Sequence, residues 1–329
     1  MGEAVRVFSA SKISRRDNTL RFDTAKGTRY YPVQDTEDIH LFGECALNTK
    51  LLNFLAQEEI PVHVYSYYGY WSGSFVPRTS NVSGHVFLKQ VEHYLSPSER
   101  RKLARGFVEG ALRNLGAILA QHKESVSREV ASRYSAPYLE KAKRADTIEQ
   151  LMAIEGEARR NYYSQWDKIV VRSGLEFERR TRRPPANEMN AMISFGNGLL
   201  YTAALSEIHK TPLDPRIGFL HSANQRRYSL NLDLAEIFKP VLVDRAIFAL
   251  LNRSQIGRGD FDHSKGGVHL KESARKKFVE EFEKRMKTTL HHEKLGRRVS
   301  YRNLLRMEVY KIEKHILDDQ MYSPFVMEH

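Results

Sequence analysis

The chain has 329 residues, of which 41% are hydrophobic, so it is long enough for two domains and is not mostly disordered. Its single cysteine, Cys45, excludes an internal disulfide framework and a cysteine-rich zinc module, and it fits a reducing compartment. The N-terminus does not have the pattern of a signal peptide, and no apolar run approaches the roughly 18 residues of a membrane-spanning helix. We therefore expect a soluble cytoplasmic protein without membrane association.

Charge is distributed unevenly along the chain. Lys and Arg number 52 against 40 Asp and Glu, a formal net charge of +12. Residues 1–80 hold nine basic and nine acidic side chains, so the whole excess lies beyond residue 80. A polyanionic partner such as nucleic acid, bound by the second part of the chain, would account for this excess. A solvated basic surface with no such partner is the alternative.

The first eighty residues have the composition of a small β-domain. Short runs rich in β-branched and aromatic residues are separated by turn signals. The five expected strands are Val5–Phe8, Thr19–Phe22, Arg29–Val33, Ile39–Phe42 and Pro61–Tyr67. One helix is expected among them, because Leu47, Leu51 and Leu55 recur at helical spacing.

Beyond about residue 85 the apolar period becomes helical. Ser96, Pro97 and Glu99 predict a helix start with a capping box, and Asp146–Glu149 and Asn187 predict two further starts. The other expected helices begin near Asn231, with Pro240 ending or kinking that helix, and cover roughly 271–290 and 300–318. With a polar stretch near 78–95 as the boundary, the prediction is an α+β chain, with a β-domain over 1–84 and an all-helical domain over 85–329.

A carboxylate stands on the apolar face of the helix that begins near Asp146. Glu155 shares that face with Leu151, Ala158 and Tyr162. A buried carboxylate is costly unless a cation meets it. The cation is either Arg159, one turn further along the helix, or a positively charged group that the protein binds.

A histidine and a second pair of carboxylates follow. His221 ends an apolar turn, where a satisfied structural histidine is the ordinary interpretation. Asp233 and Glu236 lie three residues apart on one helix, so they project to the same side, where a divalent cation would relieve their repulsion. Two solvated carboxylates are the alternative. One imidazole with several oxygen ligands suits Mg²⁺ or Mn²⁺ better than zinc, and such an ion within a basic domain is typical of phosphodiester chemistry.

At these residues the sequence resembles the CRISPR-associated endonuclease and integrase of the adaptation module, CRISPR-associated protein one, which inserts new spacers into the CRISPR array. The matching stretches, spread over nearly the whole chain, are Leu41–Gly43, Ile60–Val64, Gly69–Pro77, Ile154–Gly156, Ala158–Arg159, Tyr162–Tyr163, Arg183–Pro185, Asn190–Gly196, Leu213–Pro215, Gly218–His221, Leu230, Asp233–Leu234, Glu236 and Phe238–Pro240. Their order and spacing make the resemblance more specific than any one of them.

The resemblance implies a β-sandwich-like N-terminal domain, an all-helical catalytic domain and a homodimer that forms through the first domain. It further implies Glu155, His221 and Glu236 as ligands of Mg²⁺ or Mn²⁺, with Asp233 as a supporting carboxylate. Glu236 stands where several relatives carry Asp, and Asn197 where Tyr is common. The implied partners are double-stranded and branched DNA and a small ferredoxin-like protein of the same module.

The metal site alone does not choose between cleavage by water and strand transfer by a DNA 3′-hydroxyl. The expected phosphate contacts are Arg159, Arg179, Arg180, Arg182, Arg183, Arg226 and Arg227, with solvated basic loops as the alternative. Two other functions stay open on the residues alone. One is a non-catalytic basic helical nucleic-acid-binding protein, and the other is a metal phosphohydrolase acting on small phosphates.

Overall fold

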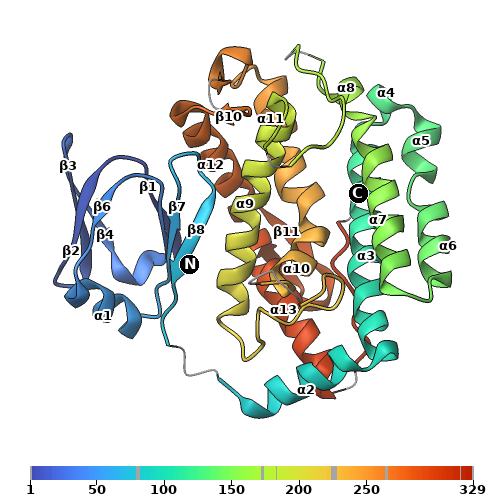
Figure 1. The fold of residues 1–329 in the computed structure, drawn as a ribbon, viewed down its shortest axis with the longest axis horizontal. Coiled ribbons are helices and arrows are strands. Elements are labelled where there is room, and N and C mark those ends of the chain that lie inside the picture. The colour runs from blue at the N-terminus through green and yellow to red at the C-terminus, as the bar shows by residue number, and fades with distance from the viewer. Residues whose placement is uncertain are drawn as a thin grey trace. The chain divides into compact units, whose positions relative to one another are not determined.

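The computed structural model describes residues 2–78, 82–171, 174–182, 184–223, 228–263, 266–318 and 320–327. The chain divides into two compact units, Met1–Val82 and Ser83–His329 (Figure 1). Most strands belong to the first unit and nearly all helices to the second, which confirms the mixed α+β class. Within the described ranges, no helix combines the length and the apolar character needed to cross a membrane.

The first unit consists of two four-stranded sheets and one helix. Its elements are β1 (Glu3–Val7), β2 (Ser11–Arg16), β3 (Thr19–Thr24), β4 (Gly27–Pro32), a 3₁₀ turn (Val33–Asp35), β5 (Thr36–Leu41), β6 (Cys45–Ala46), α1 (Thr49–Gln57), β7 (Val62–Tyr65) and β8 (Trp71–Phe75). One sheet has the order β1-β5-β7-β8, parallel except for β7 and β8. The other has the order β4-β3-β2-β6, antiparallel except for β2 and β6.

Alternate residues of both sheets form the apolar core of this unit. Ile39 and Leu41 of β5 and Leu20 of β3 are buried there with Leu55 of α1. Strands β2 and β6 were not expected from the sequence. In β2 only Ile13 is buried, so backbone pairing with β3 forms this strand rather than an apolar pattern.

The second unit is largely helical. Its helices are α2 (Gly84–Leu95), α3 (Pro97–Gln121), α4 (Lys123–Val126), α5 (Arg128–Arg133), α6 (Ala136–Arg144), α7 (Ile148–Tyr163), α8 (Trp166–Ile169), α9 (Glu188–Ile208), α10 (Leu230–Phe238), α11 (Arg245–Asn252), α12 (Glu272–Lys287) and α13 (Tyr301–Asp318). Helix α9 is buried on all sides, and α10 packs against it. Helix α3 packs against both α7 and α10, so the helices that carry Glu155 and Glu236 share one neighbour (Figure 1).

The helix signals predicted at Pro240 and Ser96 are present in the structure, but each differs in its local geometry. Pro240 lies in a π-helical turn, Lys239–Asp244, between α10 and α11, because proline has no N–H for the regular ladder. Ser96 is the N-cap of α3, and its Oγ accepts a hydrogen bond from the backbone N–H of Glu99 at 3.5 Å. The prediction of a full capping box is wrong, because the Glu99 carboxylate does not reach back to the N-cap. It accepts hydrogen bonds from Lys102 Nζ at 2.8 and 3.1 Å instead.

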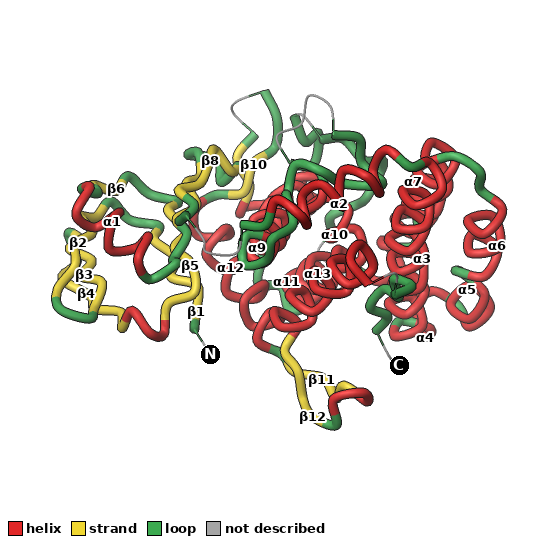
Figure 2. The backbone as a smooth tube through the Cα atoms, turned by 90° about the horizontal axis from the view of Figure 1, so that it is seen from below, coloured by secondary structure: helices red, strands yellow, loops and turns green. Residues whose placement is uncertain are grey.

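The expectation of an entirely helical second part is wrong at two places. Strand β9 (Phe261–Asp262) pairs with β10 (His269–Leu270), and β11 (Thr289–His292) pairs with β12 (Arg297–Ser300), both antiparallel. Figure 2 shows the β11–β12 hairpin extending away from the helices. A 3₁₀ turn precedes each of β9 and β12, at Arg258–Asp260 and Glu293–Leu295, and Gly296 takes the left-handed conformation (φ +59°) that a tight turn demands.

Candidate metal centre

Asp233 is completely buried in the first turn of α10 and organises the loop before that helix. Its Oδ2 accepts hydrogen bonds from the backbone N–H groups of Phe219 and Leu220, at 2.5 and 3.0 Å. Its Oδ1 accepts from the backbone N–H of His221 at 2.8 Å and lies 2.7 Å from His221 Nδ1. Because an ionised carboxylate only accepts, Nδ1 carries a proton, and the lone pair of the neutral ring lies on Nε2.

Gly218 lets this loop lie directly on α10. Its N–H donates to Ser229 Oγ at 2.8 Å. A Cβ atom at this position would lie 2.7 Å from the carbonyl carbon of Ser229, 2.8 Å from Asp233 Oδ2 and 2.9 Å from the backbone nitrogen of Leu230. The close approach therefore requires glycine.

Glu236 faces the same imidazole. Its Oε1 lies 4.0 Å from His221 Nε2 and also pairs with the ammonium of Lys239, one turn along the chain. Its Oε2 accepts from Arg159 Nη2 at 2.9 Å. Both carboxylate oxygens of this buried residue are thus matched to cations.

Arg159 links α7 to α10. Its Nε donates to Glu155 Oε1 at 3.0 Å, its Nη2 donates to Glu236, and its Nη1 lies 3.9 Å from Asp244 Oδ2. Glu155 is only partly buried, with 18% of its side chain exposed, and the salt bridge with Arg159, one of the two explanations for its place on the apolar face, is present. It also brings Glu155 and Glu236 to one guanidinium, which the sequence pattern of α7 alone could not show.

The pKa values follow from this packing. Burial by itself would raise the pKa of Glu236, but the charges of Lys239, Arg159 and His221 lower it to about 2. Burial raises the pKa of Asp244 to about 7, against the opposing charge of Arg159. Burial by itself would lower the pKa of His221, but its hydrogen bond to Asp233 and the charges of Asp233 and Glu236 outweigh this and raise it.

These residues fit a hard divalent cation. Two donors at about 2.1 Å from one ion lie at most about 4.2 Å apart, and His221 Nε2 and Glu236 Oε1 are 4.0 Å apart. A histidine ligand ordinarily donates its other ring N–H to a carboxylate, as His221 does to Asp233. Glu155 is linked to Glu236 through Arg159, whose guanidinium pairs with both carboxylates, and Lys239 also pairs with Glu236.

The arginines expected to contact phosphate differ in their solvent exposure and in their contacts. Arg179 and Arg182 are exposed. Arg180 is half-buried and donates to Asn190 Oδ1 at 3.0 Å and to Ser194 Oγ at 3.1 Å, and Arg159 is buried among carboxylates. These two therefore make internal contacts instead of lying on an open basic surface. Arg183, Arg226 and Arg227 lie outside the described residues.

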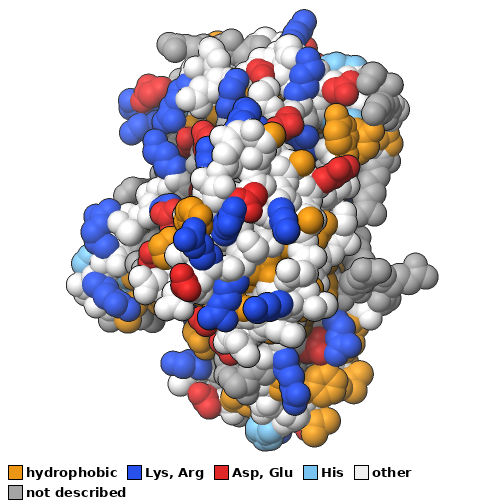
Figure 3. All heavy atoms as spheres, turned by 90° about the vertical axis from the view of Figure 1, so that its left-hand side faces the viewer, with side chains coloured by type: hydrophobic (Ala, Val, Ile, Leu, Met, Phe, Trp, Pro, Cys, Tyr) orange, Lys and Arg blue, Asp and Glu red, His pale blue; other side chains and the backbone are white. Residues whose placement is uncertain are grey.

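On the face drawn in Figure 3, Lys and Arg side chains are spread out with Asp and Glu between them.

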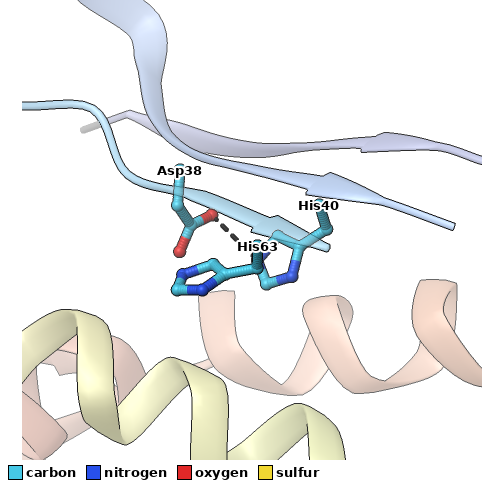
Figure 4. Close-up of side chains that lie close together, drawn as sticks. All are labelled: Asp38, His40 and His63. Carbon is cyan, nitrogen blue, oxygen red and sulfur yellow. Dashed lines mark ion pairs between the residues drawn. The ribbon is translucent and has the colours of Figure 1, made fainter. Parts of the chain in front are cut away.

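Two groups of three possible metal ligands, with one atom of each residue within 4.8 Å of the others, occur among the described residues: Asp38, His40 and His63, and His93, Glu99 and His315. Within the described part of the chain, the ligand atoms of Glu155, His221 and Glu236 do not all come this close. The first group lies on β5 and β7, where His40 and His63 are in register (Figure 4). His40 Nε2 lies 3.2 Å from Asp38 Oδ1, and the Nδ1 atoms of His40 and His63 contact Tyr65 Oη at 2.8 Å and Ser74 Oγ at 2.6 Å. The first unit thus contains a buried Asp/His/His group of its own.

Two residues of the site, Lys239 and Asp244, were not expected there from the sequence. Lys239 stands three residues after Glu236 on the same face, which is a usable signal for an ion pair. Asp244 reaches Arg159 because the π-helical turn shifts its position, and a regular helical period could not have indicated this.

Comparisons with known proteins agree with the resemblance. A family model described as CRISPR associated protein Cas1 matches residues 6–284. The CRISPR-associated endonuclease Cas1 2 of Thermodesulfovibrio yellowstonii is 43% identical over 335 residues, covering 99% of both chains. The solved structure of TM1797, a CAS1 protein from Thermotoga maritima, is 41% identical, with a TM-score of 0.87 over 98% of this chain and 99% of that one.

Two more distant structures share the fold. A casposase bound to integration product is 19% identical, with a TM-score of 0.83 over 99% of this chain and 93% of that one. A Cas6-RT-Cas1–Cas2 complex is 18% identical, with a TM-score of 0.81 over 100% of this chain and 36% of that one. The family model matches most of the chain, and a named relative is 43% identical over nearly its full length. The chain therefore belongs to the Cas1 family of CRISPR-associated proteins.

Proposed function

We propose that this chain is a divalent-metal-dependent DNA endonuclease and integrase that inserts new spacer DNA into a CRISPR array by phosphodiester transesterification. One observation carries the proposal. His221 Nε2, with its ring held by Asp233, faces Glu236 across 4.0 Å, and Arg159 ties Glu155 to the same carboxylate. Membership of the Cas1 family supplies the reaction that fits this site.

Glu155, His221 and Glu236 would hold Mg²⁺ or Mn²⁺. When bound, such an ion activates a hydroxyl nucleophile and neutralises charge that develops on the phosphate and the leaving oxygen. Asp233 holds the imidazole in the tautomer that leaves Nε2 available, and so acts as a positioning residue.

Arg159 holds the carboxylates of Glu155 and Glu236 beside one guanidinium, and Arg159 and Lys239 together keep Glu236 ionised before the ion arrives. Without these cations, burial would favour the protonated form of Glu236, which is a poor ligand. Their proximity also supplies positive charge where a phosphate group would enter.

Double-stranded or branched DNA would bind mainly through the second unit, where all the excess positive charge resides. The exposed Arg179 and Arg182 suit phosphate contacts that position DNA without distinguishing its sequence. A bound DNA 3′-hydroxyl would give strand transfer, and a bound water would give cleavage.

For the assembly, we propose a homodimer formed through the charge-balanced residues 1–84 and a small ferredoxin-like companion of the same adaptation module. Light scattering of the purified chain should give twice the 38.1 kDa monomer mass. Co-purification with that companion should give a complex that DNA strengthens. A monomer, or no association with or without DNA, would contradict these two parts of the proposal.

The test of the chemistry is Mn²⁺-dependent cleavage and strand transfer on branched DNA. Glu155→Ala, His221→Ala and Glu236→Ala should each abolish both activities, and their effects should not add, because they act on one ion. Glu157→Ala is the matched control, since this residue lies on the same helix but pairs with Lys141 at the surface.

Full activity in Glu155→Ala would leave this residue with only its Arg159 salt bridge. Tight DNA binding with no turnover at any metal concentration would favour a non-catalytic nucleic-acid-binding protein. Turnover of small phosphate esters but not of DNA would favour a metal phosphohydrolase.

A further inference from the structure

A second group of ligand-type side chains lies where three helices of the second unit meet. His93 is in the last turn of α2, Glu99 in the first turn of α3, and His315 in the last turn of α13. Helix α2 packs against both α3 and α13. One ligand atom from each side chain lies within 4.8 Å of those of the other two.

The hydrogen bonds of both histidines fix their tautomers. His93 Nδ1 lies 2.9 Å from the backbone carbonyl oxygen of Lys89, and His315 Nδ1 lies 2.9 Å from that of Gln320. A carbonyl oxygen only accepts, so each Nδ1 carries the proton and each neutral ring has its lone pair on Nε2. This is the arrangement found in histidines that ligate a metal through Nε2.

His315 provides an independent indication of a ligand site. The residue is only 5% exposed, and among the described residues its Nε2 has no hydrogen-bond partner. A buried acceptor without a partner is energetically unfavourable, because it has lost its hydrogen bond to water. Burial also lowers the pKa of His315, which favours the neutral ring that a metal requires.

Glu99 completes the group from the solvent side. Its side chain is 31% exposed and is paired with Lys102, whose own side chain is 47% exposed. Such a surface ion pair contributes little to stability, so Lys102 can leave at small cost. The two imidazole rings meet edge to face, with centroids 5.8 Å apart, and a nitrogen of each lies within 4.8 Å of a Glu99 carboxylate oxygen.

We propose that His93, Glu99 and His315 bind one zinc ion, with water in the remaining position. Two imidazoles and one carboxylate are a ligand set characteristic of Zn²⁺, whereas Mg²⁺ prefers a set made mostly of oxygen ligands. The site is distinct from the one formed by Glu155, His221 and Glu236, and it does not depend on the proposed function.

Zinc here would connect three helices to the C-terminal segment. The carbonyl that holds His315 belongs to Gln320, at the start of that segment. Further along it, the Phe325 ring stacks on Phe238 of α10 with centroids 5.4 Å apart, and the Phe325 N–H donates to Glu308 at 3.0 Å. An ion that binds only the folded chain stabilises it, so this packing behind α10 would become more persistent.

The experiment is a Zn²⁺ titration of the metal-free, full-length protein against a chromophoric chelator, in a Glu155→Ala/Glu236→Ala background that removes the first centre. We expect one zinc per chain. His315→Gln and His93→Gln should each weaken this binding by more than the roughly 10–100-fold that loss of an outer hydrogen-bond partner costs. Co²⁺ should give visible d–d bands that the same variants lose. His85→Gln, exposed on the same helix α2, is the matched control and should bind zinc normally.

Glu99→Gln keeps the test decisive if a histidine variant fails to fold, because this side chain is partly exposed. It should bind zinc more weakly and lose the rise in melting temperature that zinc gives the parent. The proposal is overturned if the parent binds no zinc, or if its affinity is unchanged by Glu99→Gln and by both histidine variants.

Discussion

Asp233→Asn tests whether the second carboxylate of α10 acts through the imidazole of His221. The asparagine has nearly the same shape but only one acceptor oxygen, and Asp233 accepts four hydrogen bonds. In the arrangement of lowest energy, the amide oxygen of the asparagine still accepts the hydrogen bonds from the backbone N–H groups of Phe219 and Leu220. The amide NH₂ then faces the backbone N–H of His221 and its Nδ1.

Two consequences follow from that arrangement. The backbone N–H of His221 loses its acceptor, which lowers the free energy of unfolding by about 1–3 kcal/mol. Nδ1 becomes an acceptor for the amide, so the ring proton moves to Nε2, the atom that faces Glu236. Because that lone pair is then unavailable, Mn²⁺ affinity should fall about 10–100-fold.

The assays are urea unfolding, Mn²⁺ titration by electron paramagnetic resonance, and the ¹⁵N shifts of His221 at a pH where the ring is neutral. Glu157→Gln, a surface carboxylate on α7, is the control and should change none of the three. If the ring of the Asp233→Asn variant keeps its proton on Nδ1 and its affinity for Mn²⁺, then Asp233 does not position His221.

Three further predictions concern the loop, the titration of the site and the DNA surface. Gly218→Ala should lower the free energy of unfolding by about 1–3 kcal/mol in urea, because its Cβ would lie 2.7 Å from backbone, whereas Gly198→Ala, with nothing within 4 Å, should not. Folding raises the pKa of His221, so its protonation stabilises the metal-free protein at low pH and this stabilisation is lost as pH rises through the folded-state pKa. Mn²⁺ needs the neutral ring, so its binding should release a proton, and the acidic midpoint of activity should move down as Mn²⁺ is raised; a fixed midpoint would exclude His221 as a ligand. Arg179→Ala and Arg182→Ala should each reduce the slope of log affinity for duplex DNA against log salt by about 0.9, while Arg16→Ala, exposed in the charge-balanced first unit, should leave it unchanged.

Local patterns in the sequence determined the parts of this protein that depend on neighbours along the chain. The N-cap at Ser96 and the break in regular α-helix at Pro240 follow from local residue chemistry. The shared face of Asp233 and Glu236 follows from their spacing, since helical geometry relates residues three or four apart. The separation of a charge-balanced first part from a basic second part is likewise a property of composition.

Only the tertiary structure decided what each of these side chains meets. Periodicity places Glu155 on one face of its own helix. It cannot show that Arg159 bonds both Glu155 and Glu236, which lies 81 residues after Glu155 in the chain. Nor can it distinguish Asp233, saturated by N–H groups of the preceding loop, from Glu236, which faces an imidazole lone pair. His93 and His315 come together for the same reason: contacts between distant segments arise from the packing of whole helices, which spacing within one helix does not encode.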